Sequence, residues 1–200
     1  MLSAVKPRAS MRSFDPRLVG GLETDAWVAY YRREWLAFLR AVVRLVRHTF
    51  ALPWPATLYG AWLVLRANQL WAPYPDNDPD GARRAMCRFY ALVAKRHRER
   101  FDVDEAARLE VEWWRVHRVR QREDRAAQAD SLIDAIAALY AHVYGIERSA
   151  ARPAAEQRTL AMDLSDRWVD ESCLQASPLL APERAALVRS YAALLAAVHR

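Results

Sequence analysis

The stretch DAWVAYYRREWLAFLRAVVRLVRHTF, residues 25–50, decides the fold class of this chain. On a helical wheel its aromatic and aliphatic side chains gather on one side and its arginines on the other, as in a helix that packs one face on a core. The apolar side comprises Trp27, Tyr31, Trp35, Phe38, Val42, Leu45 and Val46, and the basic side comprises Arg33, Arg40, Arg44 and Arg47. The pattern predicts one long amphipathic helix.

The rest of the chain continues the helical period, with no convincing strand. Segments with that period lie at residues 57–72, 81–101, 105–122, 126–144, 154–173 and 182–199. We therefore predict an all-α fold, a single-domain bundle of about six or seven helices over residues 23–200, preceded by a flexible N-terminal tail over residues 1–22. Residues 51–75 carry one formal charge, Arg66, and are expected to be the most buried part of the bundle.

Composition indicates a cytoplasmic protein of one domain. The 200 residues are enough to bury one core, and the abundance of arginine over lysine, together with that of alanine, is typical of a high-GC bacterial genome. The two cysteines, Cys87 and Cys173, are too few for a disulfide framework. The N-terminus lacks the apolar run of a signal peptide, so export is not expected.

The charge-poor segment 51–75 raises the question of a membrane span. Prolines near both of its ends leave too few residues to cross a bilayer, and Arg66 near its middle would cost about 3 kcal/mol on insertion. A span is therefore disfavoured, whereas peripheral contact with the inner membrane surface is kept as an alternative.

Four polar side chains fall on or near faces that should be apolar: Glu34, Arg66, Glu110 and His117. Glu110 and His117 are seven residues apart and project from the same side of one predicted helix. A charged group that faces a core must be paired, ligated or protonated, because burying it bare costs several kcal/mol. The four groups are therefore expected to form an internal polar network or to hold a metal ion.

The metal alternative uses Glu34, Glu110 and His117 as ligands. Carboxylates and a histidine that project from separate helices into a bundle suit iron or manganese. The Glu110 and His117 pair resembles a ligand pair of the haem-oxygenase-like di-metal oxidases, and this resemblance of two residues implies a non-haem di-metal oxidoreductase. That family draws further ligands from later helices, but here His142 and His199 have no carboxylate three or four positions before them.

Other functional motifs are incomplete. The loop DNDPDG, residues 76–81, matches the first half of a calcium loop, but Cys87 stands where the closing glutamate is needed. Acidic residues such as Glu99, Asp102 and Asp104 interleave with the basic residues in and after the run over residues 94–101, and no nucleic-acid module is legible there, so nucleic acid is disfavoured as a partner. The chain has no phosphate-binding glycine loop and no Gly-x-Ser-x-Gly nucleophile motif.

The first half of the chain is therefore the predicted functional part. Residues 27–73 hold five of the eight tryptophans, beside the arginines of the first helix. We predict an accessory protein that uses this half to bind an apolar ligand, a partner protein helix or a membrane surface. Ligand or cofactor binding is assigned to Trp62, Arg66, Trp113 and Trp114. The alternative is a metal-dependent oxidoreductase with iron or manganese inside the bundle.

Overall fold

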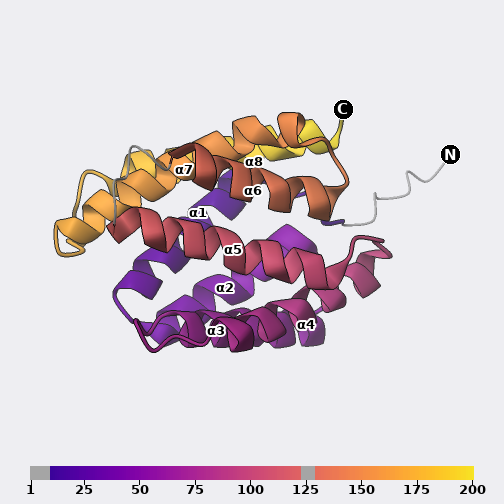
Figure 1. The fold of residues 1–200 in the computed structure, drawn as a ribbon, viewed down its shortest axis with the longest axis horizontal. Coiled ribbons are helices and arrows are strands. Elements are labelled where there is room, and N and C mark those ends of the chain that lie inside the picture. Colours follow the sequence, from indigo (N-terminus) through magenta and orange to yellow (C-terminus); the bar gives the residue numbers. More distant parts are fainter. Residues whose placement is uncertain (1–9, 123–128) are drawn as a thin grey trace, which may run out of the picture.

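The computed structural model describes residues 10–122 and 129–200, which form eight α-helices and no strand (Figure 1). The helices are α1 (Pro16–Tyr31), α2 (Trp35–Phe50), α3 (Trp54–Trp71), α4 (Pro79–His97), α5 (Val103–Arg122), α6 (Ala129–Tyr144), α7 (Arg148–Asp170) and α8 (Leu180–Val198). The all-α prediction is confirmed. The described chain has more helices than the six or seven predicted.

One additional helix arises because the predicted helix over residues 25–50 is two helices. Arg33, with a φ of 59°, has the left-handed conformation that commonly follows a helix end. The N–H of Glu34 donates to the carbonyl of Ala29 at 2.8 Å, so the backbone at the end of α1 is hydrogen-bonded as the chain reverses. This break has no signal in the sequence, because neither glycine nor proline occurs there.

The helix α1 also begins inside the predicted tail. Pro16 occupies its first turn, and the carboxylate of Asp15 accepts a hydrogen bond from the N–H of Arg17 at 2.9 Å. Just before it, Met11 and Phe14 are buried in the core. The tail prediction is therefore wrong for residues 11–22, while residues 1–9 lie outside the described residues.

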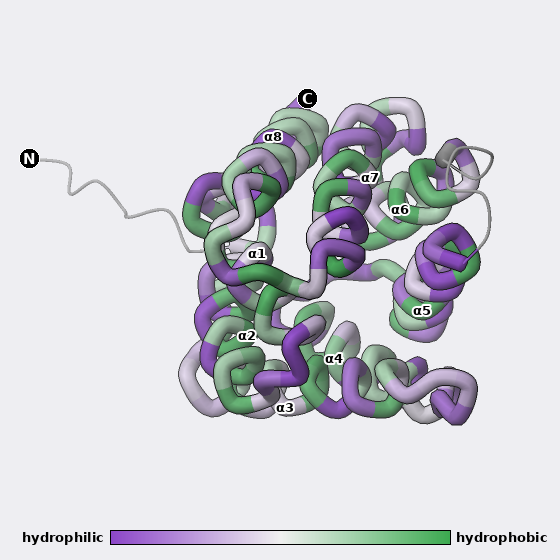
Figure 2. Tube along the Cα trace, turned by 90° about the vertical axis from the view of Figure 1, so that its left-hand side faces the viewer, coloured by the Kyte–Doolittle hydropathy of each residue, from purple (hydrophilic) through white to green (hydrophobic). Residues whose placement is uncertain are grey.

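The eight helices close a ring, which Figure 2 views nearly along its axis. Each helix packs on the next one in the chain, and α8 packs back on α1. The helices α6, α7 and α8 lie on one side of the ring, α2, α3 and α4 lie on the other, and α1 and α5 lie between them (Figure 2). One continuous cluster of buried apolar side chains draws on all eight helices.

The helix α3 is buried on one side only, which corrects the prediction that residues 51–75 would be the most buried segment. Gly60, Ala61, Leu63 and Ala67 face the neighbouring helices. On its other side four large apolar residues are 45–55% exposed, namely Trp54, Leu58, Tyr59 and Trp62. Scarcity of charge indicated an apolar helix, but its position in the ring leaves one apolar side in solvent. Among the described helices, none combines the length and the apolar character that a membrane span requires.

Candidate functional site

A buried ion pair between two residues that are far apart in the sequence lies at the centre of the ring. Arg158 of α7 donates hydrogen bonds to both carboxylate oxygens of Glu23 of α1. The hydroxyl of Tyr191 also donates to Glu23, at 2.6 Å, and the hydroxyl of Tyr140 accepts from Arg158 at 3.2 Å. Burial lowers the pKa of Arg158, but the adjacent Glu23 carboxylate outweighs this effect and raises the pKa above its ordinary value. The guanidinium is therefore charged and paired.

Two tryptophan rings flank the same guanidinium. The central carbon of the Arg158 guanidinium lies 5.5 Å from the ring centroid of Trp27 and 5.4 Å from that of Trp113. At these distances the negative faces of the rings attract a cation. The centre of the ring is thus already built to hold one positive charge between aromatic side chains.

A second buried carboxyl, that of Glu110 on α5, has only neutral hydrogen-bond donors. It accepts from the hydroxyl of Tyr90 at 2.6 Å and from the indole Nε1–H of Trp114 at 3.2 Å. No cation of the described residues forms an ion pair with it. Burial raises the pKa of Glu110, although the hydrogen bond from Tyr90 and the more distant charge of Arg158 oppose the increase.

Both carboxyls line one central cavity of about 200 Å³, to which all eight helices contribute. Its walls are mostly aliphatic and aromatic, and its charged side chains are Glu23, Glu110 and Arg158. Glu110 is partly accessible and lines this cavity. Trp113 and Trp114, predicted as ligand-binding residues, lie in the cavity wall.

His117 belongs to a neighbouring polar group. Its Nε2 lies 3.1 Å from the carboxylate of Asp166, which is 1% exposed and also accepts a hydrogen bond from Gln121. His117 and Gln121 line a smaller cavity of about 110 Å³. His117 and Glu110 therefore have separate partners and line separate cavities.

The predicted cluster of Glu34, Arg66, Glu110 and His117 is not formed. Glu34 is exposed and pairs with Arg32 at 2.8 Å, because the break after α1 turns it away from the core. Arg66 is exposed on the outer side of α3 and donates to Gln69. Within residues 10–122 and 129–200, no group of three His, Cys, Asp or Glu side chains is arranged to hold a metal ion.

Trp62, the remaining predicted ligand-binding residue, belongs to a surface on the outside of the ring. We define the α2–α3 face by its exposed residues Leu36, Arg40 and Arg44 of α2 and Trp54, Leu58, Tyr59, Trp62 and Arg66 of α3. The guanidinium of Arg47 lies 4.2 Å from the ring centroid of Trp54 and links the two helices. Between residues 35 and 75 the sequence contains no carboxylate side chain.

The sequence reasoning missed Glu23 and Arg158. Glu23 fell at the edge of the predicted tail, outside any complete helical wheel. Arg158 had a usable signal, since it shares one helical side with Ala151, Ala154 and Ala161, all fully buried. An arginine in an alanine-rich apolar stripe indicates a buried partner.

Comparisons with protein-family models, with curated proteins and with solved structures found no match in any of the three. By its fold, the described chain is an all-α protein built as a closed ring of helices. The chemistry of the central cavity and of the α2–α3 face therefore carries the functional inference.

Proposed function

We propose that this protein binds peripherally to anionic membrane surfaces through the α2–α3 face. The observation that carries the proposal is the exposed apolar side of α3, bordered by arginines and free of carboxylates. A helix that presents tryptophan and leucine between cationic side chains has the composition of a segment that lies in the membrane interface.

The apolar part of the face suits the depth of lipid headgroups. Trp54, Leu58 and Trp62 follow one another at intervals of four residues, so they project from one side of α3. The rings of Tyr59 and Trp62 are stacked, with centroids 6.0 Å apart. Tryptophan and tyrosine favour the membrane interface because each combines a large apolar ring with one polar group.

The charge of the face favours lipid over an ordinary protein partner. Arg40, Arg44 and Arg66 are exposed, and Arg47 is partly exposed beside Trp54. A protein partner would have to supply several matched carboxylates, whereas an anionic bilayer presents negative charge at every point of the contact. Each arginine near such a surface contributes about 1 kcal/mol of binding free energy.

Vesicle co-sedimentation tests the proposal. The protein is expected to bind vesicles that contain phosphatidylglycerol more tightly than vesicles of phosphatidylcholine alone, and added salt should weaken the binding. Replacing both Leu58 and Trp62 by serine should abolish it. The matched control is Leu160→Ser on α7, which removes an exposed apolar side chain from the opposite side of the ring.

A second pair of variants isolates the charge contribution. Arg40→Gln and Arg44→Gln should each weaken binding about fivefold, whereas Arg167→Gln, which removes an exposed arginine of α7, should have no effect. Equal binding to both kinds of vesicle, or none to either, contradicts the proposal. A dimer in light scattering that Trp62→Ser converts to a monomer would instead assign the face to a second copy of the chain.

A further inference from the structure

We propose that the central cavity is a binding site for a small apolar amine, held as its ammonium ion with Glu110 as the counter-ion. This inference is independent of the membrane proposal, because it concerns the inside of the ring. It rests on the charge of the side chains that face the cavity, on the cavity walls and on its size.

The cavity contains one carboxyl more than it contains cations. Glu23 and Arg158 form a closed ion pair, and Glu110 has no cationic partner among the described residues. The other titratable groups in the wall are the phenols of Tyr90, Tyr140, Tyr144 and Tyr191, whose pKa values are raised by burial, so that these groups are neutral. A ligand with one positive charge would give the cavity a balanced set of charges.

The walls are chemically suited to such a ligand. Trp113 and Trp114 lie beside Glu110, and Trp113 already attracts the guanidinium of Arg158 through its ring. Aromatic rings next to a carboxylate are the arrangement that recognises organic ammonium groups. The Tyr90 and Trp114 hydrogen bonds occupy part of the acceptor capacity of Glu110, since a carboxylate offers about four lone-pair positions. The remaining positions can accept ammonium N–H groups.

The size of the cavity sets the ligand class. An apolar cavity of about 150 Å³ holds benzene, so about 200 Å³ has room for one aromatic ring with a short aminoalkyl arm. The apolar part of the wall, with Phe38, Val42 and Leu139 among its residues, would contact the ring. We therefore infer an arylalkylamine or an aliphatic amine of similar volume.

Isothermal titration calorimetry near neutral pH tests this inference with three probes of similar shape. These are phenethylamine, which is cationic, phenethyl alcohol, which is neutral, and hydrocinnamate, which is anionic. The amine is expected to bind at least about tenfold more tightly than the alcohol, and hydrocinnamate is expected not to bind. Equal binding of amine and alcohol, or no binding of the amine, overturns the proposal without any variant.

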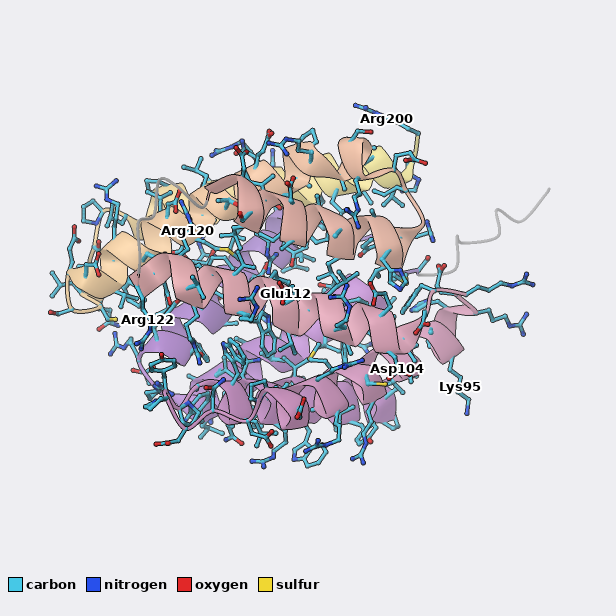
Figure 3. All side chains as sticks on the ribbon, viewed as in Figure 1. Lys95, Asp104, Glu112, Arg120, Arg122 and Arg200 are labelled. Atoms are coloured by element: carbon cyan, nitrogen blue, oxygen red, sulfur yellow. The ribbon has the colours of Figure 1, made fainter. Side chains whose placement is uncertain are left out.

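The variant Glu110→Gln removes the charge but keeps a side chain that can accept from Tyr90. It is expected to lower the affinity for phenethylamine at least about tenfold and to leave that for phenethyl alcohol unchanged. The matched control is Glu112→Gln on the same helix. Glu112 pairs with Arg115 outside the cavity and is labelled in Figure 3, and its loss should leave amine binding unchanged. Retained amine affinity in Glu110→Gln contradicts the assignment of the counter-ion.

Proton release on binding provides a second test of the contact between the amine and Glu110. Burial raises the pKa of Glu110, and an ammonium ion beside it stabilises the carboxylate, so binding of the amine is expected to lower that pKa and to release protons to solvent. The measured heat should then differ between phosphate and Tris buffers, because the two buffers take up a proton with different enthalpies. In Glu110→Gln this difference should disappear, and a difference that persists would overturn the role of Glu110.

Discussion

Glu183, in the first turn of α8, is fully buried, and neither of its carboxyl oxygens has a hydrogen-bond partner among the described residues. Burial raises its pKa to about 8, with Glu23 and Asp166 adding to the increase and Arg184 opposing it. The positive end of the α8 dipole offers some compensation to a carboxylate there. At neutral pH the side chain is mostly protonated, because the charged form would be unpaired in the interior.

Glu183 should make the protein less stable as the pH rises. Its pKa is higher in the folded chain than in the unfolded chain, so its stabilising effect is complete below about pH 4.5 and is lost as the pH rises through about 8. Glu183→Gln should remove this decline and be more stable than the parent protein above that pH, by several kcal/mol. Urea denaturation over a pH series measures the difference. The exposed Glu156→Gln serves as control, and an unchanged pH dependence in Glu183→Gln would contradict the prediction.

The Glu23 and Arg158 ion pair should show strong coupling between its two partners. Arg158→Met leaves Glu23 buried without its cation, and Glu23→Leu leaves Arg158 without its anion, so each should lower the free energy of unfolding by about 3 to 5 kcal/mol. In the double variant the free energy of unfolding should fall by less than the sum of the two single losses, because no unpaired charge is left. Chemical denaturation of the four proteins measures this coupling, and strictly additive losses would show that the pair is not formed.

At the scale of the helix, several helices end at a non-glycine residue that has a left-handed backbone conformation. Arg33, Ala51 and Arg98 have φ values of 59°, 47° and 59° at the ends of α1, α2 and α4. This conformation is strained for a residue with a Cβ atom and is free of that strain in glycine. Arg33 stops a helix that the sequence pattern alone would continue, so packing of the next helix must maintain that turn.

Arg98→Gly should therefore stabilise the protein by up to about 1 kcal/mol, since glycine adopts the left-handed conformation without strain. The Arg98 side chain is exposed and hydrogen-bonded to no described residue, so little is lost with it. The matched control is Arg96→Gly, inside the last turn of α4, which should destabilise by about 0.5 to 1 kcal/mol. Thermal unfolding of both variants checks the opposite signs, and a loss of stability in Arg98→Gly would be inconsistent with strain at this turn.

At the scale of the whole molecule, the described helices share one main core beside a small cluster of Ala161, Ala186 and Leu187, and we expect the ring to unfold in one step. Buried side chains from every helix belong to one cluster, so no subset of helices keeps a complete core of its own. The substitutions Leu63→Ala on α3 and Leu132→Ala on α6 should each lower the free energy of unfolding by about 2 to 5 kcal/mol. In each variant, the unfolding transition measured by circular dichroism and the one measured by tryptophan fluorescence should shift by the same amount. Separate transitions in either variant would show that the two sides of the ring fold independently.

The ring also places the two proposed sites on opposite sides of the same helix. Phe38, Val42 and Val46 of α2 line the central cavity, while Arg40 and Arg44 lie on the α2–α3 face. The exposed charged side chains of Lys95 and Arg200 also extend away from the ring (Figure 3). The amphipathic pattern of α2 thus separates the internal cavity from the external cationic face.

The sequence by itself determined the all-α class and the approximate position of most helices, because helical periodicity is a local property of the chain. It also marked Trp113 and Trp114, which line the cavity, and Glu110, whose polar character on an apolar side was recognisable from its own helix. Each of these conclusions needed only residues that are close in sequence.

Tertiary structure alone decided the closure of the ring, the outward turn of Glu34, the exposure of one side of α3 and the pairing of Glu23 with Arg158. The ion pair joins residues 135 positions apart, and no wheel drawn on one helix can show which distant helix lies opposite. Burial and partnership depend on how helices are arranged in space, and that arrangement follows from packing over the whole chain.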